Sequence, residues 1–282
     1  MRTNSELPPW TRVLLTALIS VGIATVVYWL SSIVASAAQP ALPATCRLEG
    51  CFCEASSGHF PEQVANAISS FAFVFLGIWA LLSTREPMLG TRERALKPYF
   101  AVTMLFLGVS SFYYHATLSF IGQFFDIFSM YTFGLLLLLG ALYRSGHVAG
   151  WLAATLFGVL TVALAVTQYL FPEARRILFA LVLLPGIVLE LTPFVTGYGP
   201  RSPRMRFVYI GVGALVVAYA IWLLDQNHIV CNPDSIVQGH AIWHVLTALA
   251  AFMIFLHYRQ TPHAAPPNRR QKFEARSRRS AG

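Results

Sequence analysis

Two histidines spaced four residues apart are the clearest chemical feature of this sequence. His240 and His244 open its last long apolar segment. On a helix, this spacing places both imidazoles on one face, so that they can bind the same metal ion. A third histidine, His115, lies near the end of a separate apolar segment and could complete the set. Three imidazoles with one open position are typical of catalytic zinc, which lowers the pKa of a water molecule to about 7.

Two further polar side chains accompany these histidines. Ser111 lies one helical turn before His115, and it could hydrogen-bond the oxygen of a tetrahedral intermediate. Asp126 lies in the next apolar segment, where it could orient a histidine or act as a base toward water. Any one of these residues alone is more often a helix-end residue, and a His-x3-His pair arises by chance in many sequences. Their combination favours a metal site.

Long apolar runs must position these residues. Of the 282 residues, 56% are hydrophobic and only 11% are charged, whereas soluble domains carry about 25% charged residues. A bilayer core of about 30 Å takes roughly 20 helical residues, and runs of that length recur eight times. The sequence therefore predicts an all-α polytopic membrane helix bundle, with a seven-span core and one extra N-terminal span. The expected spans are 11–36, 62–83, 98–118, 121–142, 149–170, 177–197, 207–225 and 238–258, with a break near Ser119–Gly122.

Basic residues predict the orientation of this bundle. With the N-terminus inside, 17 of the 20 Lys and Arg residues fall in inner segments and three in outer ones. The positive-inside rule then places both termini in the cytoplasm. His115, Asp126, His240 and His244 all come within about two helical turns of the outer boundary, although they played no part in setting the topology. Short basic patches between spans also need no nucleic-acid partner to explain them.

All four cysteines fall in segments expected to lie outside. These are Cys46, Cys51, Cys53 and Cys231. In an oxidising compartment they predict two disulfides, with three connectivities open. The alternatives are chance placement or a metal-binding Cys51-Phe52-Cys53 segment.

The chain divides into four parts. The first span ends in Ala35-Ser36-Ala37, which resembles a signal-peptidase site, but its apolar run exceeds the usual 7–15 residues of a signal peptide. A retained anchor is therefore favoured over a cleaved signal peptide. The expected parts are an anchor over 1–37, an outer Cys-containing loop over 38–61, a catalytic seven-helix domain over 62–258 and a disordered basic cytoplasmic tail over 259–282.

Three other ionisable residues are expected to lie outside the chemical cluster. Glu190, near the inner end of its span, is expected to snorkel or to have a structural role. Asp225, at the outer end of the seventh span, is expected to be hydrated. His257, at the inner boundary, is expected to be solvated.

The segments around these residues resemble the alkaline ceramidase family of seven-span hydrolases, part of a superfamily that includes progestin/adipoQ receptor-like proteins. The resemblance rests on residues 108–118, on Gln123–Asp126 with Met130, and on 239–244, and it extends over about 46–258. It implies a zinc amidase that cleaves the N-acyl bond of a ceramide-like membrane lipid, releasing a fatty acid and an amine lipid. It also implies a bacterial member, in the inner membrane, with its site on the periplasmic side.

Residue roles follow from the same resemblance. It implies zinc ligation by His115, His240 and His244, a water-orienting carboxylate at Asp126 and a polar group beside the zinc at Ser111. It further implies a Cys53–Cys231 disulfide, which leaves Cys46 and Cys51 as the second pair.

The sequence departs from the family at its calcium motif. Family members often bind calcium through a cluster reading like Asp-Trp-Cys-Glu, but here the first position is Cys51. Glu54 remains as a candidate calcium ligand, although calcium takes six to eight oxygens. Where family members usually have Ser-Asn, this sequence has Ser69-Ser70.

Two other functions are compatible with these residues. The main alternative to a hydrolase is a non-catalytic receptor or lipid-binding protein with structural zinc, and a haem or metal carrier is the third possibility.

Overall fold

The computed structural model describes residues 8–37, 42–46, 50–83, 91–192 and 205–260, and these residues form an all-α fold. Their only extended pairing is an isolated bridge between Pro43 and Ser119. The helices are α1 (Pro9–Ala37), α2 (Val64–Ser69), α3 (Phe71–Leu82), α4 (Thr91–Thr117), α5 (Phe120–Arg144), α6 (Gly150–Leu170), α7 (Arg175–Leu191), α9 (Arg206–Gln226) and α10 (Gly239–Gln260), with a 3-10 turn η1 (Pro172–Ala174) before α7.

Seven of the described segments are long and apolar enough to cross a membrane, and the chain is an integral multi-pass membrane protein. They comprise α1, the combined α2–α3 segment, α4, α5, α6, α9 and α10. The span expected over 177–197 corresponds to α7, which has 17 residues and does not belong to this set. Residues 193–204 lie outside the described residues, and so do residues 261–282 of the tail predicted to be disordered over 259–282. The first two residues of that tail, Arg259 and Gln260, are instead the last residues of α10.

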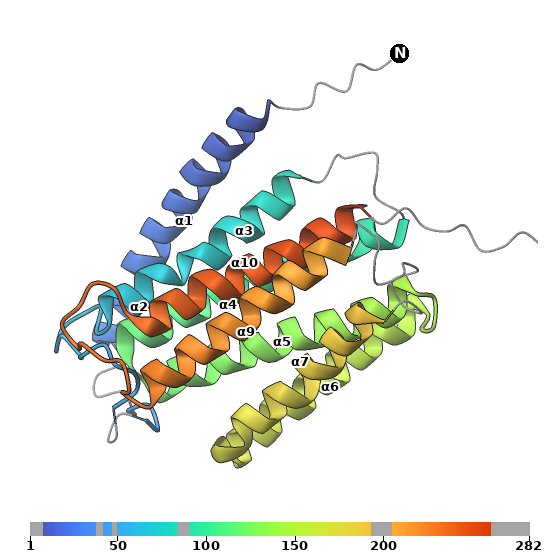
Figure 1. The fold of residues 1–282 in the computed structure, drawn as a ribbon. Coiled ribbons are helices and arrows are strands. Elements are labelled where there is room, and N and C mark those ends of the chain that lie inside the picture. Colours follow the sequence, from blue (N-terminus) through green and yellow to red (C-terminus); the bar gives the residue numbers. More distant parts are fainter. Residues whose placement is uncertain (1–7, 38–41, 47–49, 84–90, 193–204, 261–282) are drawn as a thin grey trace, which may run out of the picture.

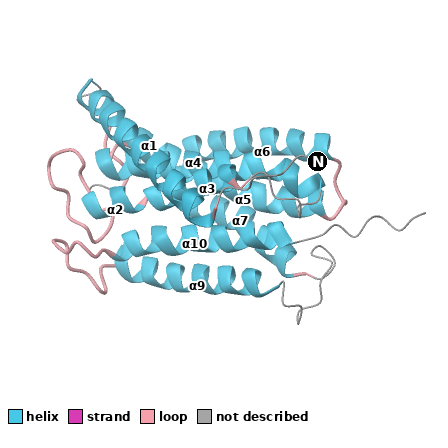
Figure 2. Cartoon of the chain, turned by 90° about the horizontal axis from the view of Figure 1, so that it is seen from above, coloured by secondary structure: helices cyan, strands magenta, loops and turns pink. Residues whose placement is uncertain are grey.

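The helices run alongside one another in an elongated bundle (Figures 1 and 2). α4 packs between α3 and α5, α5 also contacts α6 and α7, and α10 lies beside α9. One apolar cluster joins α3, α4, α5 and α10, and a second joins α5, α7, α9 and α10. Large apolar side chains cover the outside of α1 and α6, as expected where helices face lipid.

α1 packs against α3 and α4 at one end and diverges from α3 toward its own N-terminal end (Figure 1). Its Tyr28 ring contacts Phe60 and Phe112, with ring centroids 5.2 and 6.5 Å away. The N-terminal segment is therefore a helix packed on the bundle in this structure.

A sharp break separates α4 from α5, as the sequence predicted. Leu118 has a positive φ of 42°, and the Ser119 hydroxyl accepts a hydrogen bond from Gly122 N at 3.1 Å, which caps the start of α5. The break reverses the chain so that the end of α4 and the start of α5 lie at the same end of the bundle (Figure 1). This is the end at which the chemical residues occur.

A buried ion pair connects three helices near the opposite end. Arg144 of α5 donates two hydrogen bonds to the Glu190 carboxylate of α7, at 2.5 and 2.6 Å. Tyr258 of α10 donates a third to Glu190 at 2.7 Å, and the Arg144 guanidinium lies 4.0 Å from the Tyr258 ring centroid. Glu190 therefore has a structural role, and its side chain does not snorkel to the membrane surface.

His257, expected to be solvated, is fully buried beside Tyr258, because the apolar cluster of α10 continues as far as this residue.

Glu190→Ala is expected to destabilise the protein by about 3–5 kcal/mol, because it leaves the Arg144 charge buried without its carboxylate. The free energy of unfolding in detergent, followed by circular dichroism, measures this. The double variant Arg144→Met, Glu190→Leu removes both charges and should recover most of the loss. A single variant as stable as the wild type would contradict a contribution of this pair to the packing of α7.

Candidate metal centre

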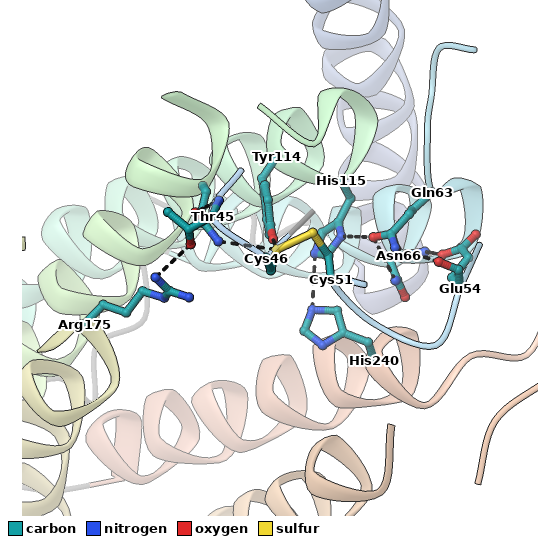
Figure 3. The surroundings of a disulfide bond; sticks show 11 residues. Thr45, Cys46, Cys51, Glu54, Gln63, Asn66, Tyr114, His115, Arg175 and His240 are labelled. Carbon is teal, nitrogen blue, oxygen red and sulfur yellow. Dashed lines mark hydrogen bonds between the residues drawn. A yellow bond between two sulfur atoms is a disulfide. The ribbon is translucent and has the colours of Figure 1, made fainter. Parts of the chain in front are cut away.

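The three predicted histidines meet at one end of the bundle. His115 belongs to the last turn of α4, whereas His240 and His244 belong to the first two turns of α10. One ring nitrogen from each residue lies within 4.8 Å of the others, and all three side chains are buried. The His115 and His240 Nε2 atoms are 3.2 Å apart (Figure 3). Among the described residues, this is the group of metal-ligating side chains that could hold an ion.

The His115 ring is oriented by Gln63, whose side chain is fully buried. Gln63 Nε2 donates to Glu54 O at 2.8 Å, which leaves its Oε1 facing His115 Nδ1 at 2.9 Å (Figure 3). An amide oxygen only accepts hydrogen bonds, so His115 Nδ1 must carry the hydrogen. In the neutral ring, Nε2 then presents a bare lone pair toward His240.

The His244 ring is oriented in a similar way by the α2 segment. Its Nδ1 lies 2.8 Å from the Ser69 hydroxyl, and that hydroxyl also lies 2.9 Å from Asn66 O. If the hydroxyl hydrogen goes to the carbonyl, the Ser69 oxygen must accept the hydrogen of His244 Nδ1. The His244 Nε2 lone pair is then also directed away from α2, toward Ser111 at 3.3 Å.

This arrangement fits a metal ion such as zinc. Two nitrogens bound at about 2.0–2.1 Å to one tetrahedral zinc lie about 3.3–3.4 Å apart, close to the 3.2 Å between His115 and His240. The two ring orientations deduced above leave Nε2 of His115 and Nε2 of His244 unprotonated, as metal ligation requires. The buried Nε2 atoms of His115 and His240 face each other, and they need a shared cation or proton between them.

His240 is held mainly through its backbone. Its N–H donates to Asp225 Oδ2 at 3.0 Å, and its ring stacks on Phe52 with centroids 3.7 Å apart. His240 Nδ1 has no hydrogen-bond partner within the described parts of the chain. Asp225, expected to be hydrated, is instead 1% exposed, because its carboxylate also accepts a hydrogen bond from Cys53 N at 3.2 Å.

Ser111 and Asp126 lie beside the histidines but do not join the ligand group. The Ser111 hydroxyl contacts His244 Nε2 and receives a hydrogen bond from Ser70 at 3.1 Å. The Asp126 side chain of α5 lies near the Ser111 hydroxyl. The carboxylate is therefore next to a residue that contacts His244, and it is not part of the histidine group.

Glu54 serves as a helix cap, and the structure gives no support to calcium there. Its two carboxylate oxygens accept hydrogen bonds from Ala65 N at 2.7 Å and Asn66 N at 2.9 Å, at the start of α2 (Figure 3). Burial raises the pKa of the Glu54 carboxyl, the two N–H donors lower it, and the nearby Asp225 carboxylate raises it further. Both oxygens therefore already have donors.

Two disulfides hold the loops over this end of the bundle. The structure contains Cys46–Cys51 and Cys53–Cys231, the pairs implied by the resemblance. The second bond joins the segment before α2 to the segment before α10, which are separated by 178 residues in sequence. Phe52, between the bonded residues Cys51 and Cys53, stacks on the His240 ring.

Comparison with known proteins agrees with this geometry. Residues 52–277 match the family model described as ceramidase. The chain is also 24% identical over 222 residues to a putative alkaline ceramidase of Dictyostelium discoideum, covering 66% of this chain and 76% of the relative. The family match covers most of the chain, including all three histidines. The chain belongs to the ceramidase family.

Sequence reasoning missed three residues that position the histidines of this ceramidase-family protein. Gln63 was not identified at all, Ser69 was noted only as part of a motif, and Asp225 was assigned to solvent. Gln63 and Asp225 are polar residues near the ends of apolar runs, which is a weak signal. Gln63 contacts His115, which is 52 residues away, and Asp225 contacts Cys53, which is 172 residues away, so local pattern could not reveal these contacts.

Gly239→Ala is expected to destabilise the protein by about 1–3 kcal/mol, because an added Cβ would lie 2.9 Å from Asp225 Cβ. Gly213→Ala on α9 is the matched control, since its added Cβ meets nothing within 4 Å. That control should be neutral or more stable by up to about 1 kcal/mol, because alanine favours helix. Thermal unfolding in detergent measures both, and equal shifts would contradict the tight contact at Asp225.

Proposed function

We propose that this protein hydrolyses the N-acyl amide bond of a ceramide-like membrane lipid in a zinc-dependent reaction. Water and the amide would give a free fatty acid and an amine lipid. The observation that carries the proposal is the buried group of His115, His240 and His244, in a chain of the ceramidase family. The relative from Dictyostelium discoideum, named a putative alkaline ceramidase, supports the same substrate class.

The residues divide between holding the zinc and moving protons. All three histidines would hold the ion through Nε2. For His115 and His244 this is favoured by the hydrogen bonds at Nδ1, and for His240 by the position of its Nε2 opposite that of His115. When bound, zinc supplies a Lewis acid and makes water nucleophilic at neutral pH. The Asp126 carboxylate would accept the proton of the attacking water and deliver it to the leaving amine. The Ser111 hydroxyl would hydrogen-bond the substrate carbonyl oxygen.

The position of the site at one end of the membrane helices suits a lipid substrate. It occupies the ends of α4 and α10 together with the disulfide-bonded loops, and we propose that this end faces the periplasm of a bacterium. Both termini would then be cytoplasmic, in agreement with the distribution of Lys and Arg. α7 would be a further membrane-spanning helix, and residues 1–37 would remain as an anchor outside the catalytic domain of 62–258. An amide near the lipid headgroups would lie at the depth of the histidines.

His240→Ala is expected to abolish both zinc retention and fatty-acid release while the helical content stays unchanged, because it removes one of three ligands. Zinc content by mass spectrometry and hydrolysis of a panel of N-acyl lipids, with and without chelator, measure this. His147→Ala, at an exposed histidine in the turn after α5, is the matched control and should keep both properties. Hydrolysis that survives in the metal-free variant would refute a zinc-dependent reaction.

Asp126→Asn is expected to lower kcat by about 10²–10⁴-fold while zinc content stays at the wild-type level, because the amide cannot accept the proton of water. Initial rates of fatty-acid release and zinc analysis on the same preparation measure this. Loss of zinc together with activity would show that Asp126 is needed for the metal instead. An unchanged rate would remove Asp126 from the mechanism.

A further inference from the structure

The short segment Cys53–Glu54 contacts the residues that hold two of the three histidines. We propose that the Cys53 N–H and the Glu54 C=O, with Gln63 and Asp225, form an outer brace that sets the positions of His115 and His240 for the metal. Gln63 and Asp225 would be positioning residues, neither of them a ligand. This inference rests on the proposed zinc site, but it concerns affinity for the ion, which can be measured without any substrate.

One half of the brace holds His115. The Gln63 backbone N–H donates to His115 O at 3.0 Å, and the Gln63 side chain accepts from His115 Nδ1 at 2.9 Å. Gln63 therefore hydrogen-bonds both the main chain and the ring of His115. Its amide orientation is fixed because Nε2 donates to Glu54 O at 2.8 Å, while Asn66 Nδ2 also donates to Oε1 at 3.3 Å.

The other half of the brace holds His240. Asp225, at the end of α9, accepts from His240 N at 3.0 Å and from Cys53 N at 3.2 Å, one bond to each carboxylate oxygen. Its side chain is 1% exposed, so water does not compete for these bonds. The close approach of Gly239 to the same carboxylate fixes the first turn of α10 against α9.

The two halves meet at adjacent residues. Cys53 supplies the N–H bound by Asp225, and Glu54 supplies the C=O bound by Gln63. The Cys53–Cys231 disulfide ties this segment to the loop that precedes α10. His115 and His240 are 125 residues apart in sequence. They are nevertheless connected, because Gln63 joins His115 to Glu54 and Asp225 joins His240 to the adjacent Cys53. Such outer contacts orient metal-binding histidines and raise metal affinity by roughly 10–100-fold.

Zinc affinity, measured by competition with a chromophoric chelator on the purified full-length protein in detergent, tests the brace. Gln63→Leu removes all three side-chain hydrogen bonds and should weaken zinc binding by about 10–100-fold. Gln63→Glu keeps an acceptor for His115 Nδ1 and should recover part of that loss. Gln168→Leu is the matched control, because Gln168 is also buried and donates to a backbone carbonyl, Phe124 O at 3.0 Å, on a different helix. It should bind zinc like the wild type.

A double variant tests the connection itself. Asp225→Asn replaces one acceptor oxygen by an N–H₂ group facing a backbone N–H, and it should also weaken zinc binding. Because both residues act through Cys53–Glu54, the loss in Gln63→Leu, Asp225→Asn should be smaller than the product of the two single losses. Losses that multiply would overturn the brace as a connected unit. If Gln63→Leu does not fold by circular dichroism, Gln63→Asn, one methylene too short to reach His115 and Glu54 together, takes its place with the same expected loss.

The outcomes separate this inference from the proposed function. A wild-type protein that binds zinc but cleaves no N-acyl lipid would overturn the function and leave the brace intact. Full zinc affinity in a folded Gln63→Leu or Gln63→Asn variant would overturn the brace and leave the function intact. Absence of zinc binding by the wild type would overturn both.

Discussion

The arrangement depends on buried imidazole nitrogens that face one another. His115 Nε2 and His240 Nε2 lie 3.2 Å apart, and His244 presents its Nε2 to the same region. Because His115 Nδ1 donates its hydrogen to Gln63, His115 Nε2 carries a lone pair. Without a cation, this lone pair is satisfied only if His240 Nε2 is protonated and donates to it. A proton satisfies one pair of nitrogens, whereas a metal ion satisfies all three. The burial of these polar atoms is therefore favourable when a cation is shared among them.

The rest of the fold keeps these nitrogens together. For the histidines to meet, α4 must end and α10 must begin at the same end of the bundle, although the two helices are far apart in sequence. α4 ends here because Leu118 adopts a positive φ and Ser119 caps the next helix. α10 begins here because Asp225 binds His240 N and Gly239 leaves room for it. Each of these local features is small, but together they determine the separation between His115 and His240.

Part of this could be predicted from the sequence, and the rest could not for physical reasons. Lengths of apolar runs predicted the membrane helices, because a bilayer fixes how many residues a span requires. The i, i+4 spacing of His240 and His244 predicted a shared helix face. Asp225 was predicted to be hydrated because a carboxylate at a span end usually is, yet it is buried and binds the N–H of Cys53, which lies 172 residues earlier in the sequence. Burial of this kind depends on tertiary contacts, and the roles of Gln63 and Ser69 depend on which ring nitrogen each one meets.

The polar groups of the bundle fall into two sets with different consequences. Near one end, Arg144 and Glu190 carry opposite full charges that neutralise each other directly, so that set needs no ion and contributes to packing alone. At the other end, three buried histidines lie together without a carboxylate among them, and the polar groups around them mostly orient ring hydrogens. Only this second set lies beneath disulfide-bonded loops, which hold Cys53–Glu54 against both Gln63 and Asp225. A covalent bond is useful there because neutral imidazoles, unlike an ion pair of opposite charges, do not attract one another and must be held together by the surrounding fold.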